Sequence, residues 1–372
     1  MKDFNYWKKL HENEQLEEFN TDNIGLLWLK TKSIIRKELI AEFIGRNKLQ
    51  LKETTSGKQF TELFNMLSKD PGKYHNILNK YIVEKSKRQL KAFNTEELVS
   101  ELFKLRHFEW GDYQNDLNKL LVSRYVKIYK SYSKLISKFD KEINPLVKAY
   151  ILNSWYNHWS SIMIEHIFKS HKSVLPTVGQ IKSVDFFIND IPFDLKVTYL
   201  PSEYIKGKRA EKGYPGELTY LKTKAKEANI HFNKDAKPSD IIYEIMEKMK
   251  AKNDIISKKA LQKLKVEKIR ILKEAQAKPK LLAKWLYENQ SAPRFGSENR
   301  MFLVLVDTND FSNSWKLKRD LELLRPTINK YLNNFKYTFN TKSAQKLSVK
   351  YNFPKNTSYE YTSLADVLFV VK

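Results

Sequence analysis

Apolar residues recur every three to four positions through much of the first 142 residues, which is the spacing of an amphipathic helix. The segments with this spacing are residues 60–67, 80–93, 95–106 and 116–139. Turn-forming residues interrupt the pattern at Asp70-Pro71-Gly72 and at Trp110-Gly111-Asp112. We therefore expect residues 1–142 to be a mainly helical N-terminal region, either as a separate domain or wrapped around the rest of the chain.

The pattern changes near Pro145, a residue that suits the first turn of a helix. We expect this helix to run to about residue 170. Its apolar stripe is predicted to hold Ile151, Trp155, Trp159, Ile162 and His166. Three short runs rich in β-branched and aromatic residues follow and predict strands at residues 174–176, 184–188 and 193–200.

The rest of the chain alternates between helical and strand-like patterns. Residues 201–278 are predicted to be a helical insertion, followed by a helix at 280–290. Residues 301–306 are continuously apolar, as in a strand buried on both faces. A further helix is expected at 314–324 and a last strand at 364–371. Residues 143–372 thus predict an α/β (α+β) domain with a mixed sheet.

The net charge of the chain indicates which class of partner the protein binds. The chain of 372 residues has a formal net charge of +24, so a polyanion is the leading candidate, although a generally lysine-rich composition is the alternative. The absence of cysteine excludes disulfides, thiolate metal sites and cysteine nucleophiles. No apolar run is long enough for a transmembrane helix, and the N-terminus lacks a signal-peptide pattern, so we expect a cytoplasmic protein with no membrane contact.

Candidate chemistry lies in the strands at 184–188 and 193–200. If Asn189-Asp190 forms a two-residue turn, the hairpin register places Asp185 directly opposite Asp194. Alternation then puts Lys196 and Thr198 on the same face as Asp194. Because directly opposed like charges destabilise a sheet, we expect compensation by Lys196 and by a divalent cation. Oxygen ligands without His or Cys favour Mg²⁺, with Mn²⁺ as a substitute.

Glu165 is a third candidate, at the edge of the apolar stripe of the preceding helix. A carboxylate in such a position is costly unless it binds a metal or pairs with a cation. The alternatives are a place in the metal site and a salt bridge to a Lys or Arg.

Asp185, eight intervening residues and Asp194-x-Lys196 together resemble the motif of the PD-(D/E)xK nuclease superfamily, in the form found in type II restriction endonucleases. The resemblance implies a restriction-endonuclease-like αβββαβ core, with Asp185, Asp194 and Glu165 as metal ligands and Lys196 as the catalytic lysine. It covers about residues 146–200 and 280–310. Val184 stands where the proline that names the motif would be.

Other segments predict contacts to nucleic acid. Residues 248–280 contain 12 Lys or Arg and 3 acidic residues, as expected of a phosphate clamp or of a solvated helical face. The loop at 289–300 is rich in side chains that read base edges, of which we single out Gln290, Arg294, Asn299 and Arg300. Lys316 is expected to contact the phosphate backbone at a helix start.

The sequence thus predicts a Mg²⁺-dependent endonuclease for double-stranded DNA, of the restriction or antiviral-defence type. We expect a homodimer, because double-strand cleavage needs two active sites, with the N-terminal region as interface or DNA-binding element. The alternatives are a non-catalytic nucleic-acid-binding protein and a DNA or RNA nuclease effector activated by a partner subunit. A methyltransferase or a defence-system sensor is the partner class expected in the restriction and defence settings, respectively.

Overall fold

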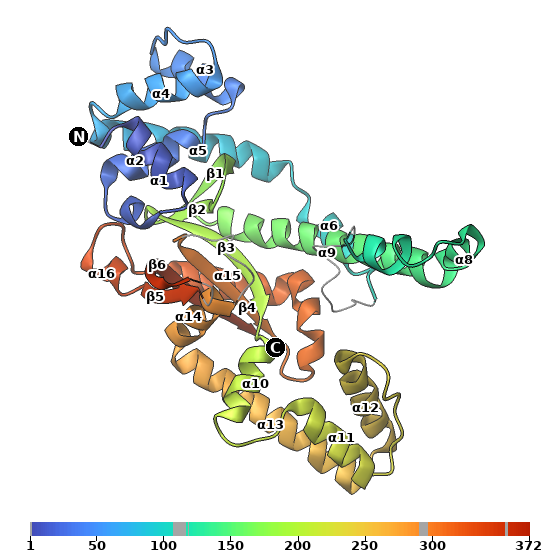
Figure 1. The fold of residues 1–372 in the computed structure, drawn as a ribbon. Helices are drawn as coiled ribbons and strands as arrows, with labels where there is room; N and C mark the ends of the chain where they lie inside the picture. The colour runs from blue at the N-terminus through green and yellow to red at the C-terminus, as the bar shows by residue number, and fades with distance from the viewer. Residues whose placement is uncertain (1, 107–116, 118, 290–296, 354–355) are drawn as a thin grey trace.

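A six-stranded mixed β-sheet runs through the centre of the computed structural model, with helices on both faces (Figure 1). The structure describes residues 2–106, 117, 119–289, 297–353 and 356–372. The strands lie in the order β1-β2-β3-β4-β6-β5. This arrangement is the α+β class expected from the sequence, with a mixed sheet.

The first three strands form an antiparallel meander, and the next two strands in the order of the sheet are each parallel to the strand before them. The strands are β1 (Val174–Ile181), β2 (Val184–Ile188), β3 (Ile191–Tyr199), β4 (Arg300–Val306), β5 (Ser348–Phe353) and β6 (Asn356–Val371). Strand β4 pairs in parallel with β3 and with β6, and β5 lies antiparallel to β6 at the edge. Every residue of β4 is buried, which confirms the prediction of a strand covered on both faces.

The two faces of β4 belong to two hydrophobic clusters. Met301, Leu303 and Leu305 pack into the cluster that contains α9 (Asn144–Lys169) and α15 (Leu321–Asn333). Phe302, Val304 and Val306 pack into the cluster of α14 (Pro279–Asn289) and the end of α13 (Ile255–Ala277). The period-2 alternation of the strand thus joins two helical layers through one sheet.

The N-terminal region is helical, as predicted, and it packs against the end of the sheet that holds β1 and β2 (Figure 1). Its elements are α1 (Phe4–Glu12), η1 (Glu17–Asn20), α2 (Asn23–Lys32), α3 (Lys37–Asn47), α4 (Ser56–Leu67), α5 (Pro71–Lys91) and α6 (Thr95–Leu102). Trp7, Leu27 and Phe64 belong to the same hydrophobic cluster as Phe187 and Phe193 of the meander. Strand β1 and the N-terminal region approach each other closely at Gly179, where an added Cβ would lie only 2.5 Å from the backbone oxygen of Ser33. Asp70 and Pro71, expected as a turn, cap and begin α5.

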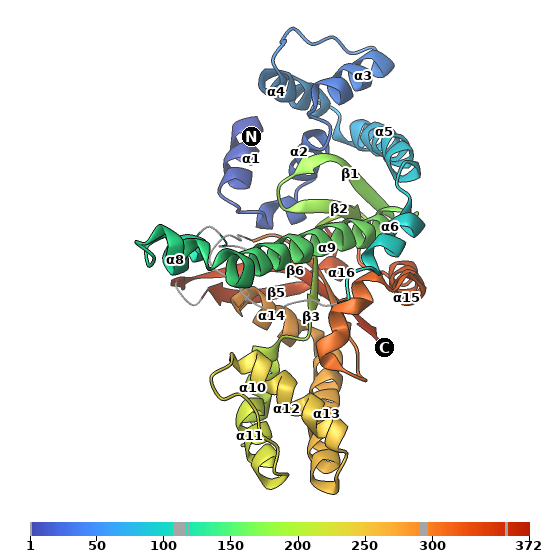
Figure 2. The same cartoon turned by 90° about the vertical axis from the view of Figure 1, so that its right-hand side faces the viewer.

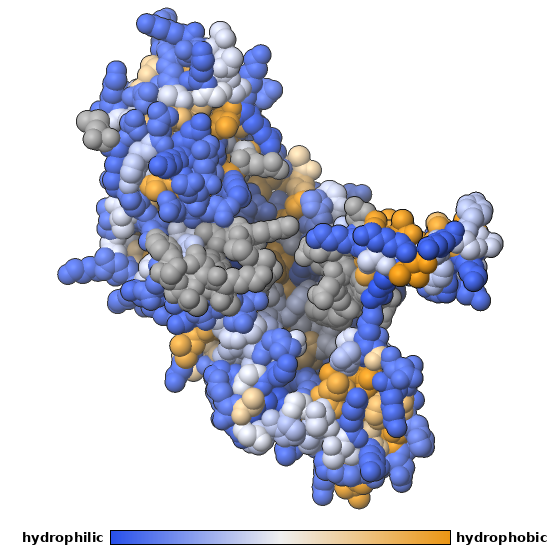
Figure 3. All heavy atoms as spheres, in the orientation of Figure 1, coloured by the Kyte–Doolittle hydropathy of each residue, from blue (hydrophilic) through white to orange (hydrophobic). Residues whose placement is uncertain are grey.

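An arm extends from the body beside the N-terminal end of α9 (Figures 1 and 2). It is formed by η2 (Val122–Val126), α8 (Tyr132–Ile136) and η3 (Phe139–Ile143). Apolar atoms gather on its surface (Figure 3), and the exposed side chains include Val126, Ile128, Tyr132 and Ile136. Trp110 to Asp112, predicted as a bend, lie outside the described residues.

The insertion at 201–278 projects from the sheet as a helical subdomain, seen at the bottom of Figure 2. It contains α10 (Ser202–Ala210), α11 (Glu217–Glu227), α12 (Pro238–Lys252) and α13. Helices α11, α12 and α13 share a hydrophobic cluster of their own, with Leu221, Ile245 and Leu264 at its centre. The prediction of a helical insertion is therefore confirmed.

Three details of the sequence prediction are wrong. The buried face of α9 is formed by Tyr156, Met163, Ile164 and Ile167, whereas Ile151 of the predicted stripe is 57% exposed. The helix expected at 314–324 is instead a 3-10 segment, η4 (Phe311–Arg319), followed by α15, because Asp320 ends the first and caps the second. Strand β5, next to the short helix α16 (Lys342–Gln345), was not predicted at all.

Among the described residues, no helix combines the length and the apolar character that crossing a bilayer requires.

Candidate active site

The hairpin that carries the candidate chemistry has the predicted register. Phe186 pairs with Phe193, and Ile188 pairs with Ile191. Asn189 and Asp190 form the turn with φ of 47° and 66°, as a two-residue turn with both central residues left-handed requires. The Asn189 side chain donates to the Tyr337 carbonyl at 2.9 Å, which fixes the turn from outside.

An ion pair between a buried lysine and Asp190 also holds this turn. The Lys30 side chain is fully buried in α2, and its Nζ lies 2.6 Å from Asp190 Oδ1. Burial lowers the pKa of Lys30, and the Asp190 carboxylate opposes that effect. The N-terminal region therefore helps to set the position of the hairpin.

Asp194 lies at the point in β3 where pairing with β2 ends and pairing with β4 begins. Residues 191–193 pair with β2, whereas Asp194 begins the parallel pairing with β4, opposite Arg300. Its backbone N–H donates to the Asn299 carbonyl at 2.9 Å. Leu195, Val197 and Tyr199 pack against the α9 cluster, so Asp194 and Lys196 occupy the other face of β3, as expected.

Asp185 lies across the hairpin from Asp194 and interacts with it electrostatically. Its Oδ2 accepts a hydrogen bond from the Leu195 backbone N–H at 2.7 Å. Burial raises the pKa of Asp185 to about 7, and the charges of Asp194 and Glu165 act in the same direction. Asp194 and Glu165 therefore both lie within electrostatic reach of Asp185.

Glu165 forms a salt bridge, which is one of the two alternatives offered by the sequence, and its place in a metal site stays a prediction. Its carboxylate forms an ion pair with Lys169, one turn further along α9. It also contributes to the raised pKa of Asp185, so it lies within electrostatic reach of the pair of aspartates.

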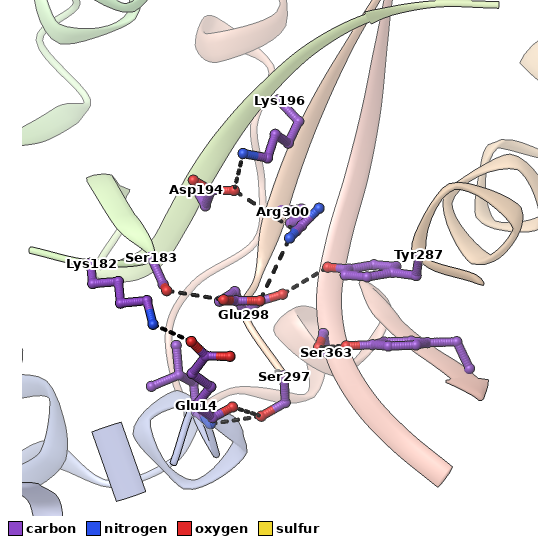
Figure 4. A network of polar contacts seen from close by, with 12 residues as sticks. Glu14, Lys182, Ser183, Asp194, Lys196, Tyr287, Ser297, Glu298, Arg300 and Ser363 are labelled. Carbon is purple, nitrogen blue, oxygen red and sulfur yellow. Dashed lines mark hydrogen bonds and ion pairs between the residues drawn. The ribbon is translucent and has the colours of Figure 1, made fainter. Parts of the chain in front are cut away.

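Two cations neutralise Asp194 (Figure 4). Lys196 Nζ lies 3.6 Å from Asp194 Oδ2, and its side chain is 36% exposed. Arg300 Nε lies 3.8 Å from the same oxygen, but the Arg300 side chain is only 1% exposed. Lys196 is therefore the cation that a substrate can reach, whereas Arg300 acts from inside the protein.

Glu298 is a fourth carboxylate that the sequence analysis missed. Its side chain is 3% exposed, accepts a hydrogen bond from Ser183 Oγ at 3.0 Å and lies 3.6 Å from Arg300 Nη2 (Figure 4). Burial raises its pKa, and the Asp194 charge adds to this effect. Arg300 thus bridges Glu298 and Asp194. The only available signal was the spacing of Glu298 and Arg300 by two residues at the start of an apolar strand.

The prediction that Asn299 and Arg300 read bases is wrong, because both side chains are buried. Asn299 is 4% exposed, donates to the Pro192 carbonyl at 2.9 Å and accepts from the Leu364 N–H at 2.9 Å. It also exchanges hydrogen bonds with Asn20. Because Asn299 and Arg300 are satisfied or paired inside the protein, neither can present its side chain to a base edge.

The other predicted nucleic-acid contacts have different outcomes. Gln290 and Arg294 lie outside the described residues. Lys316 is half-buried in η4, with its Nζ 5.7 Å from the centre of the Trp315 ring, and its role as a phosphate contact stays a prediction. Trp315 itself is buried and packs in the core.

The donor set suits a hard divalent cation. Among the described residues, no three His or acidic side chains lie close enough together to enclose a metal ion. Mg²⁺, however, binds through one or two carboxylates, with water and substrate phosphates as its other ligands. Asp185 and Asp194 provide such a pair, and an ionised Asp185 next to two further carboxylates gains from a cation, which its raised pKa reflects. Glu165 does not complete a cluster of three ligands with this pair among the described residues.

Searches against protein-family models, curated proteins and solved structures found no match for this chain.

Proposed function

We propose that this protein is a Mg²⁺-dependent endonuclease that hydrolyses phosphodiester bonds in DNA. One observation carries the proposal: Asp185 and Asp194 follow the last hairpin pair, Phe186 with Phe193, and interact electrostatically, and Lys196 lies 3.6 Å from Asp194. Two acids and an accessible amine at a break in strand pairing match the residue types and order of the PD-(D/E)xK motif. The raised pKa of Asp185 adds support, because strongly perturbed carboxyl groups concentrate at functional sites.

The finer fold assignment belongs to the same proposal. Helix α9, the meander β1-β2-β3, helix α14 and the parallel strand β4 follow one another in the order of a restriction-endonuclease-like αβββαβ core. The helical insertion lies between β3 and α14, and β6 and β5 extend the sheet beyond β4.

In this proposal each residue has a distinct role. Asp185 and Asp194 would hold the Mg²⁺ ion, with Glu165 as a further oxygen donor. The bound ion would polarise the phosphoryl group and lower the pKa of a water ligand. Lys196 would bind a phosphate oxygen and stabilise the negative charge that develops on it. Arg300 would keep Asp194 in position from within the protein.

The net charge of +24 supports a nucleic acid as the substrate, and double-stranded DNA is the form we propose. One active site cuts one strand, so we propose a homodimer for double-strand cleavage. The exposed apolar residues of the arm are the surface that such a dimer would cover. Light scattering of the wild type and of an Ile128→Lys variant tests this: we expect a dimer that the variant dissociates, and a wild-type monomer would contradict it.

Cleavage of supercoiled plasmid tests the activity directly. We expect nicking or cutting that requires Mg²⁺, is supported by Mn²⁺ in its place and is abolished by a chelator. Lys196→Ala and Asp194→Ala should lose cleavage, whereas Lys206→Ala, at an exposed lysine of α10, should keep it. Binding without cleavage under all these conditions would favour a non-catalytic nucleic-acid-binding protein. Cleavage of RNA, or only after addition of a partner, would instead indicate the effector alternative.

A further inference from the structure

A basic groove lies on the helical insertion, away from the acidic site. It has a volume of about 610 Å³ and is open to solvent along one side of α13. Its lining comprises Tyr214, Lys258, Lys259, Gln262, Lys263, Val266, Glu267 and Arg270. Four of these side chains are cationic, and the one acid among them, Glu267, already pairs with the buried Arg209.

The cations of this groove are poorly neutralised. Elsewhere on the insertion, lysines pair with nearby acids, as in Lys208 with Glu211 and Lys268 with Glu217. In the described part of the chain, Lys258, Lys259 and Lys263 have no carboxylate oxygen within 4.0 Å. The surface therefore holds a concentrated positive charge that an anion would neutralise.

Arg270 is held in place against the Tyr214 ring. Its guanidinium carbon lies 5.6 Å from the centre of the Tyr214 ring, which also carries Lys263 Nζ at 5.7 Å. The nearest acid oxygen, on Glu274, is 3.7 Å from Arg270 Nε. Nε and Nη2 have no hydrogen-bond acceptor among the described residues, although both atoms are shielded from water.

The shape of the groove favours an extended ligand. Lys259, Lys263 and Arg270 follow one side of α13 over 11 residues, which spans roughly 17 Å at the rise of an α-helix. One DNA strand carries a phosphate about every 3.4 Å along the duplex axis, so several phosphates fit that length. A compact anion would neutralise only one end of the row.

We infer that the α13 groove binds the phosphate backbone of a nucleic acid at a distance from the active site. Tyr214 orients Lys263 and Arg270, and these two with Lys259 bind successive phosphates. The inference rests on the proposed function for the identity of the substrate. It adds a sequence-independent binding surface, which positions the duplex while the acidic site performs the chemistry.

Binding measured without cleavage tests this inference. The full chain is titrated into a short fluorescein-labelled DNA duplex in EDTA, between about 50 and 200 mM salt, and anisotropy gives Kd at each concentration. The test variant carries Lys259→Gln, Lys263→Gln and Arg270→Gln. The matched control carries Lys222→Gln, Lys226→Gln and Lys234→Gln, which remove three charges from the same insertion outside the groove. Circular dichroism and thermal melting establish that both variants are folded.

We expect the groove variant to bind at least about tenfold more weakly than the control at about 150 mM salt, and the slope of log Kd against log salt to fall by about 2 to 3. Equal affinity and equal slope for the two variants would overturn the inference. Tight binding of inorganic phosphate or ATP that the groove variant loses, with DNA binding unchanged, would overturn it in favour of a compact anion site. Since the assay needs no Mg²⁺, a lack of nuclease activity would refute the proposed function and leave this result standing.

Discussion

Replacing Asp185 by Asn should stabilise the protein while it destroys the proposed active site. The raised pKa means that the folded protein holds the Asp185 proton more tightly than the unfolded chain does. A rise from the ordinary value of 3.8 to about 7 corresponds to about 4 kcal/mol of native-state destabilisation when the group is ionised. The amide that Asp185→Asn introduces keeps an oxygen that can accept from the Leu195 N–H, so the substitution removes the charge and preserves that contact.

The pH dependence of this effect has a definite sign. Below about pH 4 the carboxyl is protonated in both states, and the variant and the wild type should be equally stable at this site. Between about pH 4 and about pH 7 the unfolded chain releases the proton before the folded protein does, so wild-type stability falls as pH rises. Above about pH 7 the Asp185→Asn variant should be more stable than the wild type by up to about 4 kcal/mol.

Urea denaturation at several pH values between about 5 and 8, in a chelator, measures this difference. Asp235→Asn, at an exposed acid of the insertion, is the control and should have little effect at any of these pH values. A gain for Asp185→Asn that does not grow with pH would show that burial and neighbouring acids do not act on Asp185 as described. Added Mg²⁺ should raise the stability of the wild type but not that of the variant.

Three further substitutions test how the site is held. Asp190→Asn keeps a residue type that tolerates the turn at φ of 66°, but it leaves the Lys30 amine without its carboxylate partner. Chemical denaturation should show that this variant is less stable by about 1–3 kcal/mol. Unchanged stability would contradict a role for the ion pair. Gly179→Ala should lower the stability of the fold by about 1–3 kcal/mol, because the added Cβ would meet the Ser33 backbone oxygen. Gly45→Ala, which has open space around the added Cβ, should be neutral or slightly stabilising. Equal effects of the two substitutions would contradict the close packing at Gly179. Arg300→Met should cost about 3–5 kcal/mol because the buried Glu298 and the partly buried Asp194 lose their shared cation. Adding Glu298→Gln should recover part of that loss, and no recovery would show that the bridge is unimportant.

The local features of the hairpin could be predicted from the sequence. The turn residues and the alternation of polar and apolar positions fix the register, and the register alone brings Asp185 and Asp194 next to the last hairpin pair, Phe186 with Phe193. The buried strand β4 was equally predictable, since six consecutive apolar residues suit no exposed element.

Features that depend on contacts between distant segments could not be predicted in this way. Asn299 has the composition of a surface loop residue, yet it is buried because Asn20, Pro192 and Leu364 supply its partners from three separate segments. Arg300 looks like a base-reading arginine until the parallel pairing of β3 with β4 places it next to Asp194. The buried face of α9 was also misjudged, because an apolar stripe on a helix with several aromatic residues can be drawn in more than one way.

The most direct test of the proposed chemistry is plasmid cleavage by Lys196→Ala compared with its binding of the same DNA. We expect the variant to bind DNA with a Kd close to that of the wild type, because the side chain is one cation among many, and to lose Mg²⁺-dependent cleavage. Cleavage by Lys196→Ala at the wild-type rate would contradict the assignment of the active site.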